Sequence, residues 1–389
     1  MKKTIRDVDV SGKRVLVRAD FNVPLRDGEI TDDARIRACL PTIEDLLQRG
    51  ARVILCSHLG RPKGREQEEL RLTPVARRLS ELLARKVDFL EDCVGERVRQ
   101  AVEGMGDGDV ILLENTRFHP EEKQNDPAFA AKLAEPAELF VNDAFGTAHR
   151  AHASTEGVAR HLPAVAGLLM EKELLRLSQV RDAAEPPFAA VMGGAKISDK
   201  IGVIGNLLDR LDLLLAGGGM ANTLLRVGGV EIGRSLAEED QLETAARIAD
   251  RAGSRLVLPV DVVVAEDPRT GRGNRTVRVG NIPENSMILD VGPETLERFR
   301  KRLDGVRTVV WNGPLGAFEH PPFDRGTLAM AGILADLNAE TIIGGGDTGA
   351  AVARAGVVDR VSHVSTGGGA FLSFIQGETL PGLAVLQDK

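Results

Sequence analysis

Polar and charged side chains recur directly after short apolar runs in the first half of the chain. The runs RVLVRAD, ARVILCSH, DVILLEN and ELFVNDAF lead into residues 18–22, residues 58–61, Arg117 and Arg150. Guanidinium forks suit a small, compact anion such as a carboxylate or a phosphate ester. One arginine after a strand is usually a solvated loop residue, whereas the recurrence indicates a site. The first half is therefore predicted to bind a small anion.

Glycines take the corresponding positions in the second half. They form the groups 193–194, 217–219, 344–346 and 367–369, and Gly292 and Gly313 stand singly after two further runs. Glycine loops at helix starts let backbone N–H groups approach an extended polyphosphate. The second half is therefore predicted to bind a nucleotide.

Two lysines lie within one of these loops, in AAVMGGAKISDKIGVI. Their spacing is not that of the P-loop, G-x-x-x-x-G-K-[ST]. If Ser198 caps the following helix, Lys196 lies in the glycine loop and Lys200 in the first helical turn. A lysine in the first turn opposes the helix dipole, and a bound anion removes that penalty. Both lysines are therefore predicted to contact phosphate.

Alternative readings concern the loop GGGDTG and the histidines. GGGDTG matches G-x-G-x-x-G, but the next run ends in Ser365 and Thr366 where a dinucleotide site needs an acid. Asp347 in this loop suits Mg²⁺, which prefers one or two carboxylates plus substrate oxygens. His149 and His152 lack a third spaced ligand, so a metal site there is not favoured. Trp311 fits either a core or a nucleotide-site wall.

The elements that position these residues alternate between apolar runs and helix-period stretches. Such alternation predicts parallel sheets, whose ligands lie beyond the carboxyl ends of the strands. In EEDQLETAARIADRAG, Leu242, Ala245, Ala246 and Ile248 share one helix face and Gly253 ends the helix. The stretch LPAVAGLLMEKELLRLSQVRDA is predicted to be a long connecting helix, with the domain boundary near residue 170.

Composition limits the class of protein. A chain of 389 residues is too long for one ordinary core, and a net charge of −7 argues against bulk nucleic-acid binding. Cys39, Cys56 and Cys93 form no C-x-x-C pair, which favours a reduced cytoplasm. No signal peptide and no apolar run approaching the roughly 20 residues of a membrane span are visible.

Taken together, these motifs resemble the phosphoglycerate kinase family from end to end. The stretches VLVRADFNVP, SHLGRPKG, ENTRFHPEE, VNDAFGTAHRAHAST, VMGGAKISDKI, TVVWNGPLGAFE, IIGGGDTGAAV and HVSTGGGA occur in family order. The resemblance implies an α/β fold of two doubly wound parallel-sheet domains joined by a hinge helix. Residues 1–170 would bind 3-phosphoglycerate, residues 171–374 would bind the nucleotide, and residues from about 375 to 389 would return to the first domain.

The resemblance also implies an activity and a set of site residues. The expected activity is reversible phosphoryl transfer between ATP and 3-phosphoglycerate, with Mg²⁺, in a cytoplasmic monomer. The residues matching 3-phosphoglycerate contacts are Asp20, Phe21, Asn22, Arg35, His58, Leu59, Gly60, Arg61, Arg117 and Arg150. Those matching nucleotide contacts are Lys200, Gly292, Asn312, Pro314, Glu319, Gly345, Gly346, Asp347 and Thr348, with Asp347 also as the metal ligand. Those expected around the transferring phosphoryl group are Arg35, Lys196, Gly368 and Gly369.

One stretch departs from the family. After STGGGA the family usually continues with Ser-Leu-Glu, and this chain has FLSFIQ at residues 371–376. The polar contacts of that helix near the hinge are therefore in question. An NAD-dependent oxidoreductase and a non-catalytic polyanion-binding protein are the alternative functions. The oxidoreductase would bind NADH without using ATP. The binding protein would bind polyanions without turnover, with an affinity that falls steeply as salt increases.

Overall fold

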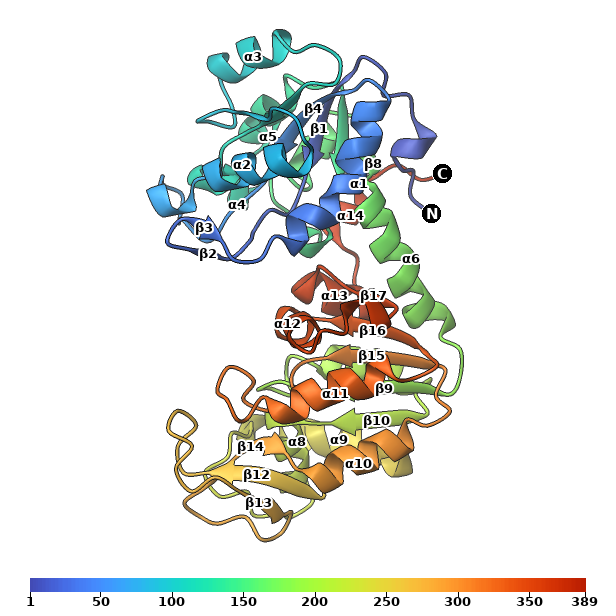
Figure 1. Ribbon diagram of the computed structural model, residues 1–389. Coiled ribbons are helices and arrows are strands. Elements are labelled where there is room, and N and C mark those ends of the chain that lie inside the picture. Colours follow the sequence, from blue (N-terminus) through green and yellow to red (C-terminus); the bar gives the residue numbers. More distant parts are fainter. The chain divides into compact units, whose positions relative to one another are not determined.

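A computed structural model describes all residues, 1–389, and divides them into two compact units. Unit 1 comprises Met1–Leu175 and Thr379–Lys389, and unit 2 comprises Arg176–Glu378. Each unit is built on a six-stranded, entirely parallel sheet, so the predicted α/β class is confirmed. The predicted boundary near residue 170 falls within helix α6 (Leu168–Ala183), which runs from unit 1 into unit 2 (Figure 1).

The sheet of unit 1 has the order β5-β6-β4-β1-β7-β8. Its strands are β1 (Arg14–Arg18), β4 (Arg52–Cys56), β5 (Asp88–Phe89), β6 (Val110–Leu112), β7 (Leu139–Asn142) and β8 (Ala164–Ala166), and a separate hairpin joins β2 (Leu25–Arg26) to β3 (Glu29–Ile30). The strand order changes direction between β1 and β7. In doubly wound sheets such a switch point is where ligands bind.

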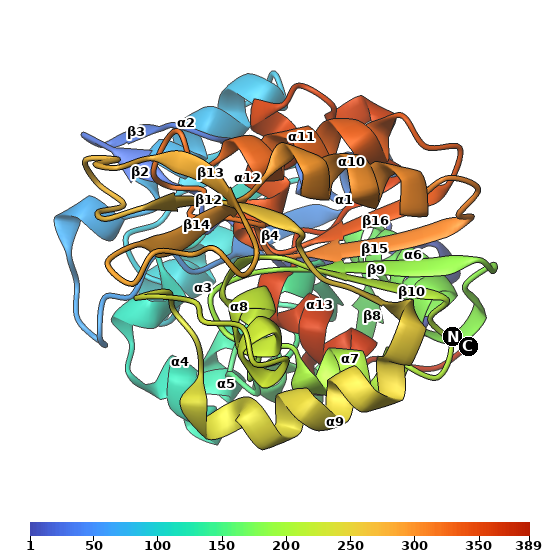
Figure 2. The same cartoon turned by 90° about the horizontal axis from the view of Figure 1, so that it is seen from below.

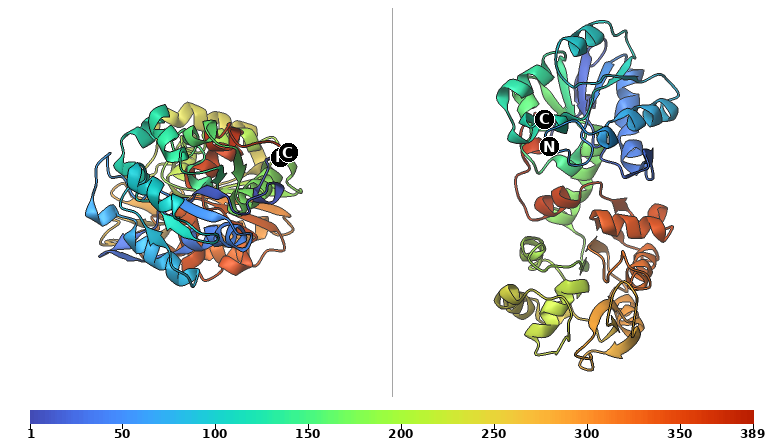
Figure 3. Two further views of the ribbon diagram at one scale, coloured as in Figure 1. Left: turned by 90° about the horizontal axis from the view of Figure 1, so that it is seen from above. Right: turned by 90° about the vertical axis from the view of Figure 1, so that its left-hand side faces the viewer.

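Helices follow the strands of unit 1 and cover its sheet. They are α1 (Ala34–Gln48), α2 (Thr73–Leu82), α3 (Glu96–Glu103), α4 (Glu121–Gln124), α5 (Pro127–Ala134) and α14 (Pro381–Ala384), with short 3₁₀ turns η1 (Ile5–Asp7), η2 (Glu68–Leu70), η3 (Thr116–Phe118), η4 (Phe145–Thr147) and η5 (Gly157–Arg160). Apolar side chains of β1, β4, β7 and α1 form its core. The two termini lie side by side in this unit (Figures 1 and 3), where Lys2 pairs with Asp388 at 3.1 Å.

The main sheet of unit 2 has the order β11-β10-β9-β15-β16-β17 and switches direction between β9 and β15. Its strands are β9 (Phe188–Met192), β10 (Leu213–Ala216), β11 (Leu256–Val257), β15 (Thr308–Asn312), β16 (Glu340–Gly344) and β17 (His363–Val364). Trp311 is fully buried in β15, and its indole N–H donates to the Gly313 carbonyl at 2.9 Å. The open question about this tryptophan is thereby answered, because it belongs to the core.

Helices lie on both faces of that sheet (Figure 2). They are α7 (Ile201–Leu207), α8 (Gly218–Val227), α9 (Leu242–Ala252) and α13 (Gly368–Ile375) on one face, and α10 (Pro293–Arg302), α11 (Arg325–Ala335) and α12 (Gly346–Arg354) on the other, with 3₁₀ turns η6 (Glu239–Gln241), η7 (Gly253–Arg255) and η8 (Val358–Arg360). Helix α9 confirms the predicted phasing, because Ala245 and Ile248 are buried and Gly253 follows at a φ of 52°.

Two details differ from the predicted elements. The run RLVLPVDVVV divides at Pro259, and its second part forms β12 (Asp261–Ala265) in an antiparallel sheet with β13 (Arg275–Arg278) and β14 (Met287–Val291). The expectation of parallel pairing throughout was therefore wrong for these strands. The predicted connecting helix also begins later than expected, because residues 164–166 form β8 and pair with β7. No helix combines the length and apolar character that crossing a membrane requires.

Candidate active site

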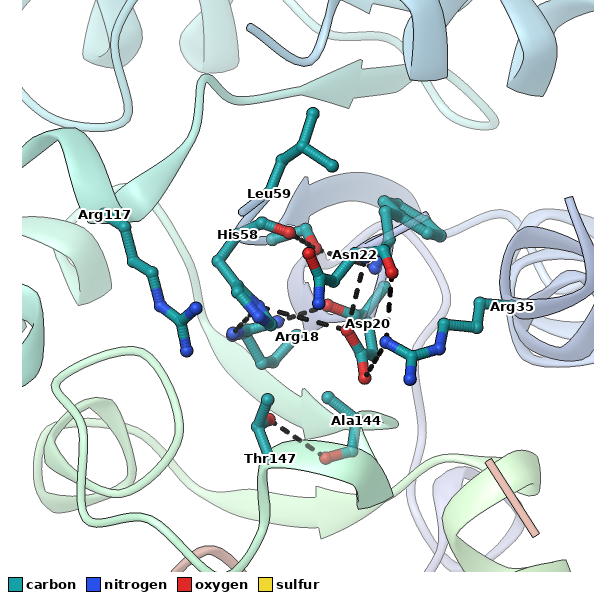
Figure 4. A network of polar contacts seen from close by, with 12 residues as sticks. Arg18, Asp20, Asn22, Arg35, His58, Leu59, Arg117, Ala144 and Thr147 are labelled. Atoms are coloured by element: carbon teal, nitrogen blue, oxygen red, sulfur yellow. Dashed lines mark hydrogen bonds and ion pairs between the residues drawn. The ribbon is translucent and has the colours of Figure 1, made fainter. Parts of the chain in front are cut away.

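The polar residues of unit 1 meet because the strands before them are neighbours. Strands β6, β4, β1 and β7 are adjacent and parallel, so their carboxyl ends lie at one edge of the sheet. Arg18 is the last residue of β1, and His58 follows β4 by two residues. Arg117 lies in η3, shortly after β6. The predicted small-anion residues Asp20, Asn22, Arg35, His58 and Arg117 therefore come together (Figure 4).

Asp20 and Arg35 form a connected pair within this edge. The Arg35 guanidinium donates to Asp20 Oδ2 at 3.3 Å and to the Asn22 carbonyl at 3.0 Å. Asn22 Oδ1 in turn accepts from the Gly60 N–H at 2.8 Å. Arg35 and Arg117 approach the region of Asp20 and His58 from opposite sides (Figure 4).

Arg117 is held rigidly and retains unused donors. Its backbone N–H donates to Asn115 Oδ1 at 3.1 Å, and its Nη1 donates to the Gly60 carbonyl at 2.8 Å. Its Nε and Nη2 atoms are buried and have no hydrogen-bond partner in the protein. A buried charged donor without an acceptor is costly, and phosphate or carboxylate oxygens satisfy it well. The geometry at Arg117 therefore favours an anionic ligand.

The electrostatics of this edge point the same way. Burial lowers the pKa of His58 well below its ordinary value, and the positive charges of Arg18 and Arg117 lower it further. The pKa of His152 falls to about 4 for the same reasons. Burial, together with Arg18 and Arg150, lowers the pKa of Arg117 to about 10. Both imidazoles are therefore neutral at pH 7 in a region of positive potential.

The remaining predicted residues of unit 1 lie around this cluster. Arg61 and Arg150 are exposed, and the Arg150 Nε contacts His149 Nε2 at 3.1 Å. Leu59 and Phe21 are buried in the hydrophobic core of unit 1, so only their backbone groups are available to the site. The Phe21 N–H donates to Ser57 Oγ at 2.9 Å, which fixes the loop after β1.

A buried chain of polar groups supports the cluster, and two of its members, Ser154 and Glu122, were not predicted as part of the site. Arg18 is fully buried and contacts His58 Nδ1 at 3.1 Å. Its Nε donates to Ser154 Oγ at 2.7 Å, and that hydroxyl donates to Glu122 Oε1 at 2.6 Å. A charged residue inside an apolar run was a visible signal for Arg18. Nothing in the sequence indicated Ser154 and Glu122, which lie more than a hundred residues from Arg18.

Glycine loops in unit 2 surround a cavity of about 270 Å³. Its walls include Leu236, Ile288, Leu289 and Leu315, and its floor includes the glycines after β9 and β10. Of the predicted nucleotide residues, Pro314, Glu319 and Asp347 line it. The apolar walls were not predicted, because the sequence does not show that Ile288 and Leu289 of β14 and two loop leucines face one cavity.

Two glycines show why this site excludes side chains. A Cβ on Gly219 would lie 2.2 Å from the Ala195 carbonyl oxygen. Gly345, the N-cap of α12, has a φ of 101°, a conformation that L side chains rarely adopt. Gly219 lines the cavity and Gly345 precedes the helix whose Asp347 lines it, and N–H groups at a helix start can face an anion.

Lys200 occupies a different helix position from the one predicted. Helix α7 begins at Ile201 with Lys200 as its N-cap, and Ser198 instead donates to Glu238 Oε1 at 2.6 Å. Ser198 was therefore wrong as the cap, since the helix begins three residues after it. The Lys200 ammonium donates to Asn312 Oδ1, and burial lowers its pKa. Lys196 is exposed in the preceding loop.

Two other predicted residues of unit 2, Asn312 and Thr348, form hydrogen bonds near Lys200. Asn312 Nδ2 donates to the Gly344 carbonyl at 2.7 Å, and Thr348 Oγ1 accepts from the Gly313 N–H at 2.8 Å. The first turns of α12 and α13 approach each other, since a Cβ on Gly368 would lie 3.8 Å from the Gly346 nitrogen. Gly369 follows within α13.

Gly292 lies apart from the cavity lining. It is the N-cap of α10, and a Cβ there would lie 2.3 Å from the Asp261 carboxylate. Close packing against Asp261 explains why glycine stands here, and the contact of Gly292 with the nucleotide stays a prediction.

The departing stretch at residues 371–376 is mostly apolar in its contacts. Phe371 is fully buried against Gly344, and the Arg181 guanidinium lies 4.4 Å from the centre of the Phe374 ring. Gln376 packs against Gly202 of α7. Aromatic packing and a cation–π contact between α13 and α6 therefore join this helix to its neighbours.

Comparisons with known proteins agree with the geometry. A family model described as phosphoglycerate kinase matches residues 5–378. The chain is 59% identical over 391 residues to a phosphoglycerate kinase of Pelotomaculum thermopropionicum and 56% identical over 392 residues to one of Desulforudis audaxviator, with 100% of each chain covered.

Solved structures are similar as well. That of phosphoglycerate kinase from Coxiella burnetii is 41% identical with a TM-score of 0.87, and that of the Pyrococcus horikoshii enzyme is 35% identical with a TM-score of 0.89. Each comparison covers 99% of this chain and 98% of the other. None of these findings supports the oxidoreductase or the polyanion-binding alternative.

Proposed function

We infer that this chain, a member of the phosphoglycerate kinase family, binds its two substrates in different units. It is a glycolytic enzyme that transfers a phosphoryl group reversibly between ATP and 3-phosphoglycerate. Unit 1 binds 3-phosphoglycerate and unit 2 binds the nucleotide. The observation that carries this division is the contrast in chemistry: buried arginine donors in one unit, and a glycine-lined cavity in the other.

In unit 1, the acceptors that Arg117 needs are supplied by 3-phosphoglycerate. Its phosphate and carboxylate oxygens match guanidinium donors from Arg35, Arg61, Arg117 and Arg150, which the resemblance also assigns to this substrate. The neutral imidazole of His58 offers a further hydrogen bond without adding charge, because its pKa lies well below 6.5. Asp20 keeps Arg35 oriented through the 3.3 Å contact.

In unit 2, the nucleotide base meets the apolar wall formed by Leu236, Ile288 and Leu289, and the phosphates meet the glycine loops. Lys200 is buried beside Asn312, so its charge is poorly solvated and favours a phosphate partner. Lys196, exposed in the same loop, is free to follow the γ-phosphoryl group. The Glu319 carboxylate on the cavity wall suits ribose hydroxyls.

The residues present fit Mg²⁺ as the partner of the nucleotide. Asp347 is an exposed carboxylate in the first turn of α12 and lines the cavity beside the glycine loops. Mg²⁺ is commonly held by one or two carboxylates plus substrate phosphate oxygens, so Asp347 would hold it here. When bound, the ion neutralises phosphate charge.

The chain's own groups provide alignment and charge stabilisation in the transfer. The 3-phosphoglycerate carboxylate is ionised near neutral pH, so it can attack phosphorus in line without a general base. Phosphoryl transfer needs little covalent help from the protein, and no covalent enzyme intermediate is required. Arg35, Lys196 and the amides at Gly367, Gly368 and Gly369 balance charge on the transferring group.

The cellular setting and assembly state complete the proposal. A glycolytic enzyme with three free, buried cysteines suits the reducing cytoplasm. Each substrate site is assembled from residues of one chain, so a monomer suffices for binding. Cell fractionation and sedimentation velocity test these two points.

The division of substrates is tested by calorimetry on two variants. Arg117→Ala should weaken 3-phosphoglycerate binding by more than about tenfold, because at least one charge-assisted bond is lost, and should leave ATP binding in Mg²⁺ unchanged. Asp347→Asn should show the opposite pattern. Arg26→Ala and Asp359→Asn are the matched controls, since both residues are exposed and lie outside the predicted sites.

A coupled assay for ATP-dependent formation of 1,3-bisphosphoglycerate accompanies the binding data. If either variant lost affinity for both substrates equally while remaining folded by circular dichroism, the assignment of one substrate to each unit would be wrong.

A further inference from the structure

Three potential metal ligands converge in unit 1 away from the anion site. One ligand atom each from Asp92, Cys93 and His119 lies within 4.8 Å of the other two. Asp92 and Cys93 belong to the loop that follows β5, and His119 directly follows η3. Two separate segments of the chain therefore supply the set.

The arrangement is held in place by its surroundings. His119 Nε2 lies 2.9 Å from Asp92 Oδ1, and the same oxygen accepts from the Cys93 N–H at 2.6 Å. The His119 ring packs against Phe129, with 5.0 Å between ring centroids. The Cys93 N–H and the Phe129 ring are outer contacts that orient Asp92 and His119 before a metal arrives, whereas the His119–Asp92 contact joins two proposed ligands.

Access and charge also suit a cation. The Asp92 side chain is 52% exposed and His119 is 31% exposed, whereas the Cys93 thiol is buried beneath them. Glu121 and Glu66 add negative charge near His119, and one buried carboxylate oxygen of Glu121 has no hydrogen-bond partner. This environment is opposite to that of His58 and its arginines.

We propose that Asp92, Cys93 and His119 form a binding site for Zn²⁺, with water as the fourth ligand. A thiolate, an imidazole and a carboxylate are the donors that zinc prefers, and Mg²⁺ disfavours the first two. Zinc bonds of about 2.0–2.3 Å place neighbouring ligand atoms roughly 3.5 Å apart. Ligand atoms as far apart as 4.8 Å must therefore approach by about 1 Å, whereas His119 Nε2 and Asp92 Oδ1 already lie 2.9 Å apart. The Cys93 thiol proton passes to solvent as the Zn–S bond forms.

Zinc at this position would act on the segment that carries Arg117. His119 lies two residues beyond Arg117, and Asn115 at the start of the same segment donates to the carbonyls of Leu59 and Leu70 at 2.8 and 3.0 Å. An ion joining His119 to the loop after β5 would fix the other end of the segment. The expected result is slower amide exchange over residues 113–120.

The test is a titration of the full-length, reduced protein with Co²⁺ and Zn²⁺. Co²⁺ should give one equivalent of sulfur-to-cobalt charge-transfer absorption, and Zn²⁺ should displace it. Cys93→Ser, His119→Gln and Asp92→Asn should each weaken Zn²⁺ binding by at least the roughly 10–100-fold that loss of even a supporting contact causes. His161→Ala is the control, because His161 is an exposed histidine of the same unit outside the cluster.

Circular dichroism without metal shows whether the buried Cys93 variant is folded, and the surface variant Asp92→Asn gives an independent test if it is not. The proposal is overturned if Co²⁺ produces no charge-transfer band, or if folded Cys93→Ser or Asp92→Asn binds Zn²⁺ as tightly as the parent. It is equally overturned if His161→Ala abolishes binding, since the ion would then lie elsewhere. Unchanged exchange over residues 113–120 in the zinc-loaded protein would remove the connection to Arg117.

Discussion

Arg35 is the residue whose contacts most closely match a role in charge stabilisation. Its guanidinium is partly exposed and bonds to Asp20 and to the Asn22 carbonyl at 3.3 and 3.0 Å, which orients it while leaving further donors. We expect Arg35→Ala to lower kcat by about 10³-fold, the order of effect seen when a transition-state arginine is lost. Steady-state kinetics at saturating substrates measure this directly.

The matched control lies two residues away on the same helix. Arg37 is exposed and pairs with Asp33 at 2.9 Å, so Arg37→Ala should change kcat by less than about twofold, as expected for a surface ion pair. A kcat for Arg35→Ala within about threefold of the parent would exclude Arg35 from the chemical step.

Individual site residues could be predicted where their position at the end of a strand determines that they lie in the site. His58 and Asp20 follow neighbouring parallel strands, so a sequence that predicts both strands also predicts that the residues meet. The contact of Arg18 with Ser154 joins residues 136 positions apart and depends on packing that no local pattern encodes. Leu236 was missed for the same reason, because its role comes only from the walls opposite it.

At the scale of elements, glycines in unit 2 should differ sharply in how well they tolerate replacement by alanine. Gly219→Ala places a methyl group 2.2 Å from the Ala195 carbonyl oxygen, so the backbone must shift at the cavity. We expect this variant to weaken ATP binding by at least about tenfold and to destabilise unit 2 by roughly 1–3 kcal/mol, as overpacking usually does. Calorimetry and denaturation followed by Trp311 fluorescence measure the two effects.

Gly205→Ala is the contrasting variant. Gly205 lies within α7 with no atom within 4 Å of an added Cβ. Alanine there should stabilise unit 2 by about 0.5–1 kcal/mol, because glycine is a poor helix former, and should leave ATP binding unchanged. Equal behaviour of the two alanine variants would mean that the close approach at Gly219 has no consequence.

Asp290, a buried carboxyl group on β14, should make the stability of unit 2 depend on pH. Burial and the nearby charge of Asp324 raise its pKa to about 7, against hydrogen bonds from the N–H groups of Gly326 and Val291. The ordinary pKa of 3.8 applies in the unfolded chain, so the folded state binds more protons between about pH 4 and pH 7. The stability of unit 2 should therefore fall as pH rises through this window and then level off.

Asp290→Asn should remove that part of the pH dependence, whatever its effect on absolute stability. The full shift corresponds to roughly 4 kcal/mol. The sequence contains one tryptophan, Trp311, which is buried in unit 2, so its fluorescence reports this unit alone. Asp359→Asn, on an exposed 3₁₀ turn, is the control. An unchanged pH profile in the Asp290 variant would show that another group titrates.

The elements themselves were predictable to different degrees. Apolar runs gave the parallel strands and the phasing of α9, because each pattern is local. The antiparallel pairing of β12 could not be predicted, since a fully apolar run fits either direction and the partner strand decides. Ser198 was a plausible cap by residue type, yet the helix begins only at Ile201, and Ser198 donates to Glu238, 40 residues away.

At the scale of the whole molecule, the division of the chain explains why two chemistries coexist. Arg117 and its neighbours belong to Met1–Leu175, and the glycine-lined cavity belongs to Arg176–Glu378. Composition predicted more than one core, and the loop residues predicted a small anion for the first and a nucleotide for the second, while the family resemblance named the substrates. That each unit takes only its own substrate remains a prediction, which the calorimetric variants test.

This division leads to a prediction about ligand-driven contraction. A ligand can drive the two units together only through interactions that it gains when they meet. 3-Phosphoglycerate is expected to contact mainly unit 1 and the nucleotide mainly unit 2, so each alone gains little. With both bound, Arg35 and Lys196 would act on one phosphoryl group. Raising the population of a contracted state from 1% to 99% needs about 5.5 kcal/mol of differential binding free energy. A few charge-assisted hydrogen bonds made only in that state supply this amount.

Small-angle X-ray scattering on the free protein, on each binary complex and on the ternary complex with a non-hydrolysable ATP analogue measures this contraction. The radius of gyration should fall clearly only in the ternary complex. Lys196→Ala is the informative variant, because Lys196 is exposed and its loss should reduce the ternary contraction without unfolding unit 2. A binary complex as compact as the ternary one would mean that a single substrate already gains enough contacts. Contraction in no complex would mean that the site forms without movement along α6.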